Sequence, residues 1–152
     1  MISSPLPDFR LHHIGYLVKD IDASTQDFIR RLGYRVESEI IEDCVQTAYV
    51  QFIRQPNASH WIELIMPNGP HSKLISSIRK GGGLHHLCYE VENIEYAIQH
   101  LRNLSMLLLA EPVLATAFPG RRIAWLMDSK NLLIELVEKG PGNLSLDSLK
   151  LE

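Results

Sequence analysis

The sequence predicts an α+β fold of two βαβββ modules, with the strands in a curved mixed sheet and the helices on one face of it. The main observation is an internal repeat. Residues 11–18 (LHHIGYLV) return 73 positions later as residues 84–91 (LHHLCYEV). A second segment, residues 61–65 (WIELI), returns 72 positions later as residues 133–137 (LIELV). Because the two displacements agree, the chain is interpreted as one structural unit present twice.

The first half has the order strand, helix, strand, strand, strand. Residues 11–18 alternate in polarity and are rich in apolar and aromatic side chains, which predicts a strand. Asp20 or Asp22 then caps a helix, since a carboxylate accepts the free N–H groups of a first helical turn. Gly33 ends the helix because glycine tolerates the left-handed backbone that follows a last turn. Three further strands are predicted at about 34–39, 45–53 and 61–66.

The second half repeats this order. Its predicted elements are a strand at 84–91, a helix at about 93–103, and strands at about 106–110, 122–127 and 132–138. The halves are joined by a turn, a short helix at 72–80 and a flexible glycine hinge at 81–83. The predicted organisation is therefore an N-terminal tail at 1–9, modules at 10–67 and 84–138, a linker with a short helix at 68–83, and a C-terminal tail at 139–152.

Each half carries a histidine and, about 50 residues later, a glutamate. The pairs are His13 with Glu63 and His86 with Glu135. Since alternate residues of a strand share a face, all four side chains are expected to project from the faces away from the helices. Gly15 and Cys88 follow the two histidines by two positions and leave room there. One histidine on a strand is usually structural, but four matched residues favour a site for a divalent metal ion. The neighbouring His12 and His85 are expected to pack or to support the ligands.

Composition limits the class of partner. The 152 residues are 45% hydrophobic, which suffices for the core of one domain, and the net charge is −3. This charge balance leaves no basic surface for nucleic acid or an anionic membrane, so the expected partner is a small molecule. There is neither an apolar run of about 20 residues nor a signal-peptide pattern. With only two cysteines, Cys44 and Cys88, the sequence predicts a cytoplasmic protein with reduced thiols.

Several short motifs carry a family resemblance. They are HHIG at 12–15, VKDI at 18–21, IEL at 62–64, GLHH at 83–86, Glu111-Pro112 and LIEL at 133–136. With these motifs the chain resembles the vicinal oxygen chelate superfamily of glyoxalase I, extradiol dioxygenases and bleomycin-resistance proteins, and within it the methylmalonyl-CoA epimerases. The resemblance implies two paired modules that form a half-barrel cleft with helices on the outside. It also implies a divalent ion (Co, Ni, Zn, Mn or Mg) held by His13, Glu63, His86 and Glu135.

The resemblance further implies a metal-dependent isomerase or epimerase that acts through an enolate on an acyl-CoA such as methylmalonyl-CoA. A Lewis acid would stabilise the enolate oxygen, while carboxylates remove a proton and return it on the opposite face. Glu42 and Glu135 are the candidates for these two catalytic carboxylates. Two alternatives stay open: a glyoxalase I-like lactoylglutathione lyase, and a non-catalytic module that binds a small molecule or antibiotic without needing metal. A homodimer is expected from the same resemblance.

Arg121 and Arg122 are the candidates for substrate binding. Arginine binds carboxylate or phosphate in a bidentate manner, so either residue could hold an acyl carboxylate or a phosphate of CoA. The alternative is that both are solvated charges at the start of a strand. The sequence does not distinguish these two interpretations.

Overall fold

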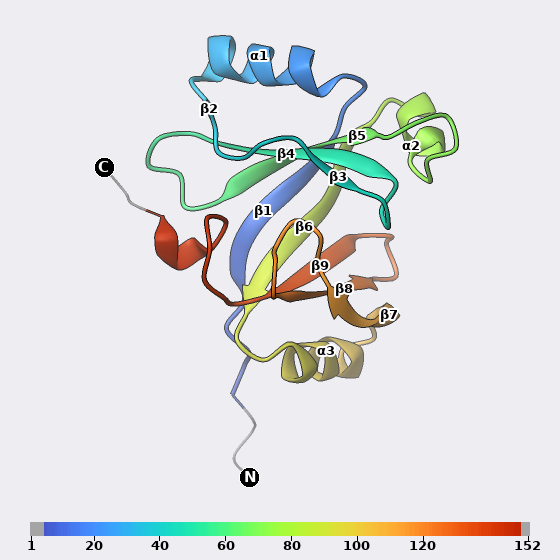
Figure 1. Cartoon of the computed structure of the whole chain (residues 1–152). Helices are drawn as coiled ribbons and strands as arrows, with labels where there is room; N and C mark the ends of the chain where they lie inside the picture. The colour runs from blue at the N-terminus through green and yellow to red at the C-terminus, as the bar shows by residue number, and fades with distance from the viewer. Residues whose placement is uncertain (1–4, 150–152) are drawn as a thin grey trace. The chain divides into compact units, whose positions relative to one another are not determined.

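The computed structural model describes residues 5–149 and divides them into two compact units (Figure 1). The N-terminal unit comprises residues 13–86 with Leu149, and the C-terminal unit comprises residues 87–148 with 5–12. Two strands contribute residues to both units: β1 (Arg10–Leu17) and β6 (Gly83–Val91). The outermost parts of both predicted tails, 1–4 and 150–152, lie outside the described residues.

The N-terminal unit contains the strand–helix–strand–strand–strand order that the sequence predicts. After β1 come α1 (Ile21–Leu32), β2 (Arg35–Val36), β3 (Ile41–Asp43), β4 (Ala48–Arg54), β5 (Trp61–Pro67) and α2 (Ile75–Arg79). The strands lie in the order β2-β4-β5-β1, with β3 also paired to β4. β1 and β5 are parallel, whereas the pairs that β4 makes with β2, β3 and β5 are antiparallel.

Helix α1 begins and ends as predicted and leaves one sheet face for the site. The Asp20 carboxylate accepts from the Ala23 N–H at 3.0 Å, and Gly33 ends the helix with a φ of 71°. Buried apolar residues on β4, β5 and α1 form a core with Phe28 packed against it. Tyr16 makes an edge contact with Phe28 on this side. Because side chains alternate along a strand, His13 and Gly15 of β1 point to the other face.

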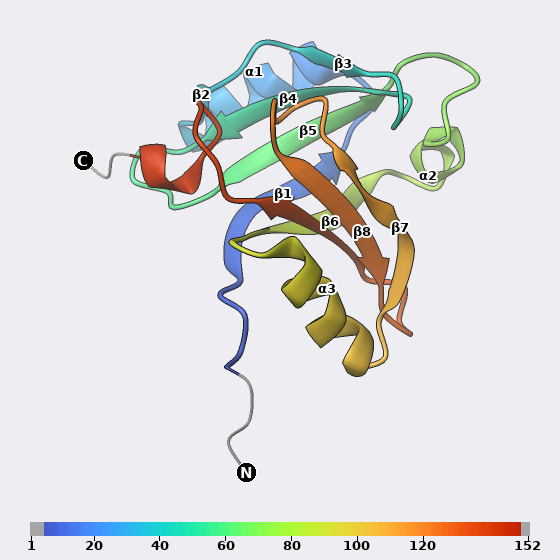
Figure 2. The ribbon, with the colours of Figure 1, turned by 60° about the horizontal axis from the view of Figure 1, so that its bottom comes forward.

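The C-terminal unit repeats this topology, which confirms the duplicated module. Its elements are β6, α3 (Ile94–Asn103), β7 (Leu107–Leu114), β8 (Arg122–Met127), β9 (Leu133–Glu138) and a short 3₁₀ helix η1 (Leu146–Ser148). The strand order is β6-β9-β8-β7, with β6 and β9 parallel and the other pairs antiparallel. Figure 2 shows α3 against the sheet of this unit. In both units, therefore, the first and last strands of the module are neighbours in the sheet and run parallel to each other.

The core of the C-terminal unit lies between α3 and the strands β6, β8 and β9. Asn93 caps α3 by accepting from the Tyr96 N–H at 2.9 Å. The fully buried residues here include Ile94, Ala97, Leu126 and Leu136. Within residues 5–149, no helix is long and apolar enough to cross a membrane.

Four predicted elements differ from the structure. The strand expected at about 34–39 is only the two-residue β2, Arg35–Val36. The strand expected at 45–53 begins later, as β4 at Ala48–Arg54. The prediction missed the short strand β3 that precedes it. The strand expected at about 106–110 extends to Leu114. The β7–β8 pair has two register shifts, and the second, between Ala110 and Val113, accommodates Pro112. The helix expected at 72–80 is shorter, at Ile75–Arg79.

The C-terminal segment, for which the sequence suggested no role, packs into its unit. Leu144 and Leu146 are buried. The Leu144 carbonyl accepts from Arg121 at 2.9 Å and lies 2.6 Å from Nε2 of His12, and the Leu146 N–H donates to Glu90 at 3.2 Å. These contacts make residues 144–146 part of the folded unit.

Candidate metal centre

Three ligand atoms converge in the N-terminal unit. They come from His13 on β1, Glu63 on β5 and His86 on β6. The two Nε2 atoms of His13 and His86 lie 3.0 Å apart, and Glu63 Oε1 lies 3.7 Å from the first and 3.5 Å from the second. Ligand atoms that share an ion at about 2.1 Å are separated by roughly 3.0–3.6 Å at octahedral to trigonal angles. The three side chains therefore fit a divalent metal ion.

Strand register explains why these residues meet. Gly15 pairs with Glu63 across the parallel β1–β5 pair, and His13 is two residues from Gly15 on the same face. The second module repeats this arrangement, since Cys88 pairs with Glu135 and lies two residues after His86. In each module, the glutamate is thus paired with the residue two positions after the histidine.

Gly15 provides the space that the His86 ring occupies. A Cβ atom at Gly15 would lie 2.2 Å from Cε1 and 2.3 Å from Nδ1 of His86, closer than non-bonded atoms approach. The residue must therefore lack a side chain if His86 is to keep this orientation. The sequence indicated that a small residue belongs here, but not that it is the His86 ring that fills the space.

The electrostatics of the cluster favour a bound cation. His13 is fully buried, and His86 and Glu63 are 2% and 7% exposed. The ring of Phe52 packs edge-on against His13 with its centroid 5.3 Å away, which adds apolar surroundings. Burying a carboxylate is costly unless positive charge or hydrogen bonds compensate it. Two imidazole nitrogens and one carboxylate oxygen are also donors that first-row divalent metals accept.

His85 contacts the other nitrogen of the His86 ring. The two Nδ1 atoms lie 2.8 Å apart, within hydrogen-bonding distance, and the ring planes are nearly perpendicular. His86 thus has one ring nitrogen toward His13 and Glu63 and the other toward His85. The sequence suggested only that His85 packs or supports a ligand.

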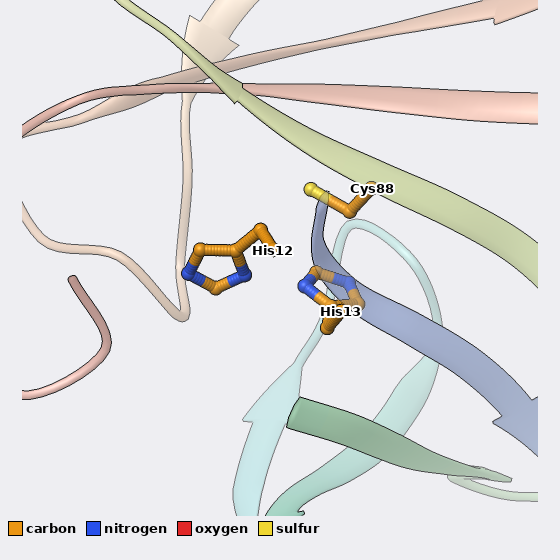
Figure 3. Close-up of side chains that lie close together, drawn as sticks. All are labelled: His12, His13 and Cys88. Atoms are coloured by element: carbon orange, nitrogen blue, oxygen red, sulfur yellow. The ribbon is translucent and has the colours of Figure 1, made fainter. Parts of the chain in front are cut away.

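Glu135 lies on β9 in the C-terminal unit and is 5% exposed. Its strand partner Cys88 is fully buried. His12 of the same unit is also fully buried, and one of its ring nitrogens lies within 4.8 Å of Cys88 Sγ (Figure 3). Since the Leu144 carbonyl can only accept, the His12 Nε2 beside it carries the proton. His12 therefore anchors the C-terminal segment.

Glu42, a predicted catalytic carboxylate, is exposed on the short strand β3. It accepts a hydrogen bond from Cys44 Sγ at 3.4 Å and one from Tyr49, its register partner on β4. These hydrogen bonds to a carboxylate raise the pKa of both the Cys44 thiol and the Tyr49 hydroxyl. Glu42 lies in the same unit as the three ligand atoms but on the other face of the sheet. Its partner Tyr49 packs against the core beneath α1, whereas Glu63 pairs with Phe52 on the face of His13.

The guanidinium groups of Arg121 and Arg122 contact groups of the protein itself. Arg121 is 3% exposed and donates to the carbonyls of Glu138 and Leu144 and to the Glu90 carboxylate, at 2.6, 2.9 and 3.1 Å. Burial lowers the pKa of Arg121. Arg122 holds Glu138 through Nε and a terminal nitrogen at 3.0 and 2.9 Å. Their assignment to substrate binding stays a prediction.

Comparison with known proteins identifies the family. A sequence model described as the glyoxalase/bleomycin resistance protein/dioxygenase superfamily matches residues 12–125. The chain belongs to this superfamily. A relative from Cereibacter sphaeroides, an ethylmalonyl-CoA/methylmalonyl-CoA epimerase, is 30% identical over 84% of this chain and 96% of its own length. The human mitochondrial methylmalonyl-CoA epimerase is also 30% identical, over 84% of this chain and 72% of its own.

A solved structure has the same fold. Methylmalonyl-CoA epimerase from Mycobacterium tuberculosis matches with a TM-score of 0.78 and 26% identity, covering 93% of this chain and 94% of the other. The superfamily that the short motifs indicated is thereby confirmed, and so is the fold that the repeat predicted. The resemblance to methylmalonyl-CoA epimerases is confirmed as well, since the two relatives and this structure carry that name.

Proposed function

We propose that the protein is a metal-dependent epimerase acting on an acyl-CoA such as methylmalonyl-CoA. The observation that carries the proposal is the convergence of His13, Glu63 and His86 at ligand distances in a chain whose relatives are such epimerases. An α-carbon next to a thioester carbonyl is a very weak acid. An enzyme that inverts it must stabilise developing negative charge on the carbonyl oxygen.

Glu135 is proposed as the fourth ligand. The support is the repeated register, in which Glu63 pairs with Gly15 and Glu135 pairs with Cys88, each two positions after a ligand histidine. Two carboxylates and two neutral imidazoles balance the charge of a divalent ion. When bound, such an ion (Co, Ni, Zn, Mn or Mg) supplies a Lewis acid toward a carbonyl oxygen.

Two carboxylates are proposed to move the proton. Inversion requires one base to take the α-proton from one face and another acid to return a proton on the opposite face. Glu135 and Glu42 are assigned these roles. The assignment of Glu42 rests on the family resemblance. Its carboxylate is exposed on the α1 side of the sheet, where Cys44 and Tyr49 donate to it.

Proton exchange tests this function. Methylmalonyl-CoA is incubated with the protein in deuterated buffer, and loss of the α-proton is followed by NMR. We expect exchange that needs added metal and that falls by about 10²-fold or more in Glu135→Gln and in Glu42→Gln. His71→Ala, at an exposed position outside the cluster, is the control. If the metal-loaded protein gives no exchange, the epimerase proposal is wrong.

Further assays on the same purified protein distinguish the epimerase from the two alternative functions. A glyoxalase I-like lyase would convert the hemithioacetal of glutathione and methylglyoxal and would leave methylmalonyl-CoA unexchanged. A non-catalytic binding module would show neither reaction and would bind its ligand equally with and without metal. The homodimer and the cytoplasmic location stay predictions, and light scattering of the purified protein tests the first.

A further inference from the structure

We propose that His85 is a positioning residue that fixes the tautomer and ring orientation of His86 for metal binding. This inference rests on the proposed metal-dependent function and concerns a residue outside the four-ligand set. It starts from the contact between the two neighbouring rings, whose Nδ1 atoms lie 2.8 Å apart.

The protonation pattern follows from the geometry. The Nε2 atom of His86 faces His13 and Glu63, at 3.0 and 3.5 Å, so Nε2 is the atom that would bind a metal. A ligating nitrogen must offer its lone pair, and a neutral imidazole then carries its proton on Nδ1. That proton needs an acceptor, and Nδ1 of His85 lies within hydrogen-bonding distance of the His86 Nδ1, at 2.8 Å. His85 must therefore be neutral, with its own proton on Nε2.

The contact also restrains rotation of the His86 ring. Gly15 lies against the ring near Cε1 and Nδ1, so that even a methyl group there would collide with it. Gly15 thus limits the position of the ring from one side, and His85 holds its Nδ1 through a directional hydrogen bond. Outer partners of this kind typically change metal affinity by about 10- to 100-fold when they are removed.

His85 is suited to this role because it is only partly buried, whereas His86 is 2% exposed. A partly exposed side chain can be replaced without opening a large cavity, which makes the role testable. The Oδ1 atom of an asparagine takes nearly the place of a histidine Nδ1 and accepts a hydrogen bond. Leucine fills similar space but accepts none.

The test is a Co²⁺ titration of the full chain, followed by the visible absorption of the bound ion. We expect His85→Leu to weaken Co²⁺ binding by about 10- to 100-fold and to alter the absorption spectrum, while His85→Asn stays within about threefold of the unmodified protein. The exposed His71→Leu should change neither quantity. Thermal unfolding without metal shows whether each variant is folded.

The outcomes separate the two proposals. If His85→Leu binds Co²⁺ as tightly as the unmodified protein does, His85 has no positioning role. The same holds if the leucine and asparagine variants bind Co²⁺ equally weakly. Neither result contradicts the metal site itself. Failure of the unmodified protein to bind Co²⁺ overturns both. Nitrogen-15 NMR of the Zn²⁺-loaded unmodified protein gives a second readout that needs no variant. A protonated Nδ1 on His86 and an unprotonated Nδ1 on His85 are expected, and the reverse pattern contradicts the inference.

Discussion

The Cα atom of Gly15 lies so close to the imidazole ring of His86 that a Cβ atom there would come within 2.2 Å of Cε1. Gly15→Ala is therefore expected to displace the ring and to weaken metal binding by about 10²-fold, because ligands must be held in place to within a fraction of an ångström. Metal titration measures the loss. Gly69→Ala is a matched control, since a Cβ atom there meets nothing within 4 Å. Equal affinity in the two variants would show that His86 does not need this space.

Arg121 is expected to stabilise the fold. Its guanidinium is buried against the Glu90 carboxylate at 3.1 Å, and removing one partner of a buried ion pair typically costs about 3–5 kcal/mol. Arg121→Met should therefore lower Tm by roughly 6–20 °C, given about 2–4 °C per kcal/mol for a chain of this size. Calorimetry measures the change, with the exposed Arg102→Ala as the control. An unchanged Tm together with a weakened acyl-CoA affinity would favour the prediction that Arg121 binds substrate over a role in stability.

The C-terminal segment should contribute measurable stability. Leu146 is 6% exposed, and truncating a buried leucine to alanine typically costs about 2–5 kcal/mol. Leu146→Ala is therefore expected to lower the free energy of unfolding by about 2 kcal/mol in urea denaturation. Leu104→Ala, at a position that is 65% exposed, should change it by less than about 0.5 kcal/mol. If the two variants unfold alike, the segment does not stabilise the C-terminal unit.

The ion pair of Arg122 and Glu138 predicts a loss of stability in acid. The hydrogen bonds from Arg122 lower the pKa of Glu138 below its usual 4.5. A carboxylate with a depressed pKa stabilises the fold above its unfolded pKa, and this contribution disappears as the pH falls through the folded pKa. Because the pair is partly exposed, solvent screens it and its contribution to stability is small.

Comparing Tm at several pH values checks this expectation. Arg122→Ala should have a slightly lower Tm than the unmodified protein at pH 7, and the difference should shrink as the pH falls below about 4.5, the ordinary pKa of a glutamate. A difference that stays constant over this range would mean that the Arg122–Glu138 pair does not control the acid sensitivity.

The repeat made most of the fold predictable. It placed eight of the strands and both long helices, because matched hydrophobic alternation and caps such as Asp20 and Gly33 are local signals. The missed strand β3 ends in a turn without Gly or Pro. Asp43 forms this turn by accepting from the N–H groups of Val45 and Gln46, and Thr47 adopts a positive φ.

The candidate site could be predicted only in part. The sequence indicated His13, Glu63 and His86 because their spacing recurs, and the structure brings these three together. The contacts of Arg121 with Glu90 and Leu144 join residues that are 31 and 23 positions apart, and no local pattern records such tertiary partners. The role of Gly15 could be recognised only once the His86 ring was placed beside it.

The most direct test of the account is the number of divalent ions bound per chain in the unmodified protein and in four single variants. The variants are His13→Ala, Glu63→Gln, His86→Ala and Glu135→Gln. Equilibrium dialysis against Co²⁺ with elemental analysis is expected to give one ion per unmodified chain and an affinity at least about 100-fold weaker in each variant. Full binding retained in His13→Ala or Glu63→Gln, or no ion in the unmodified protein, would contradict the proposed centre.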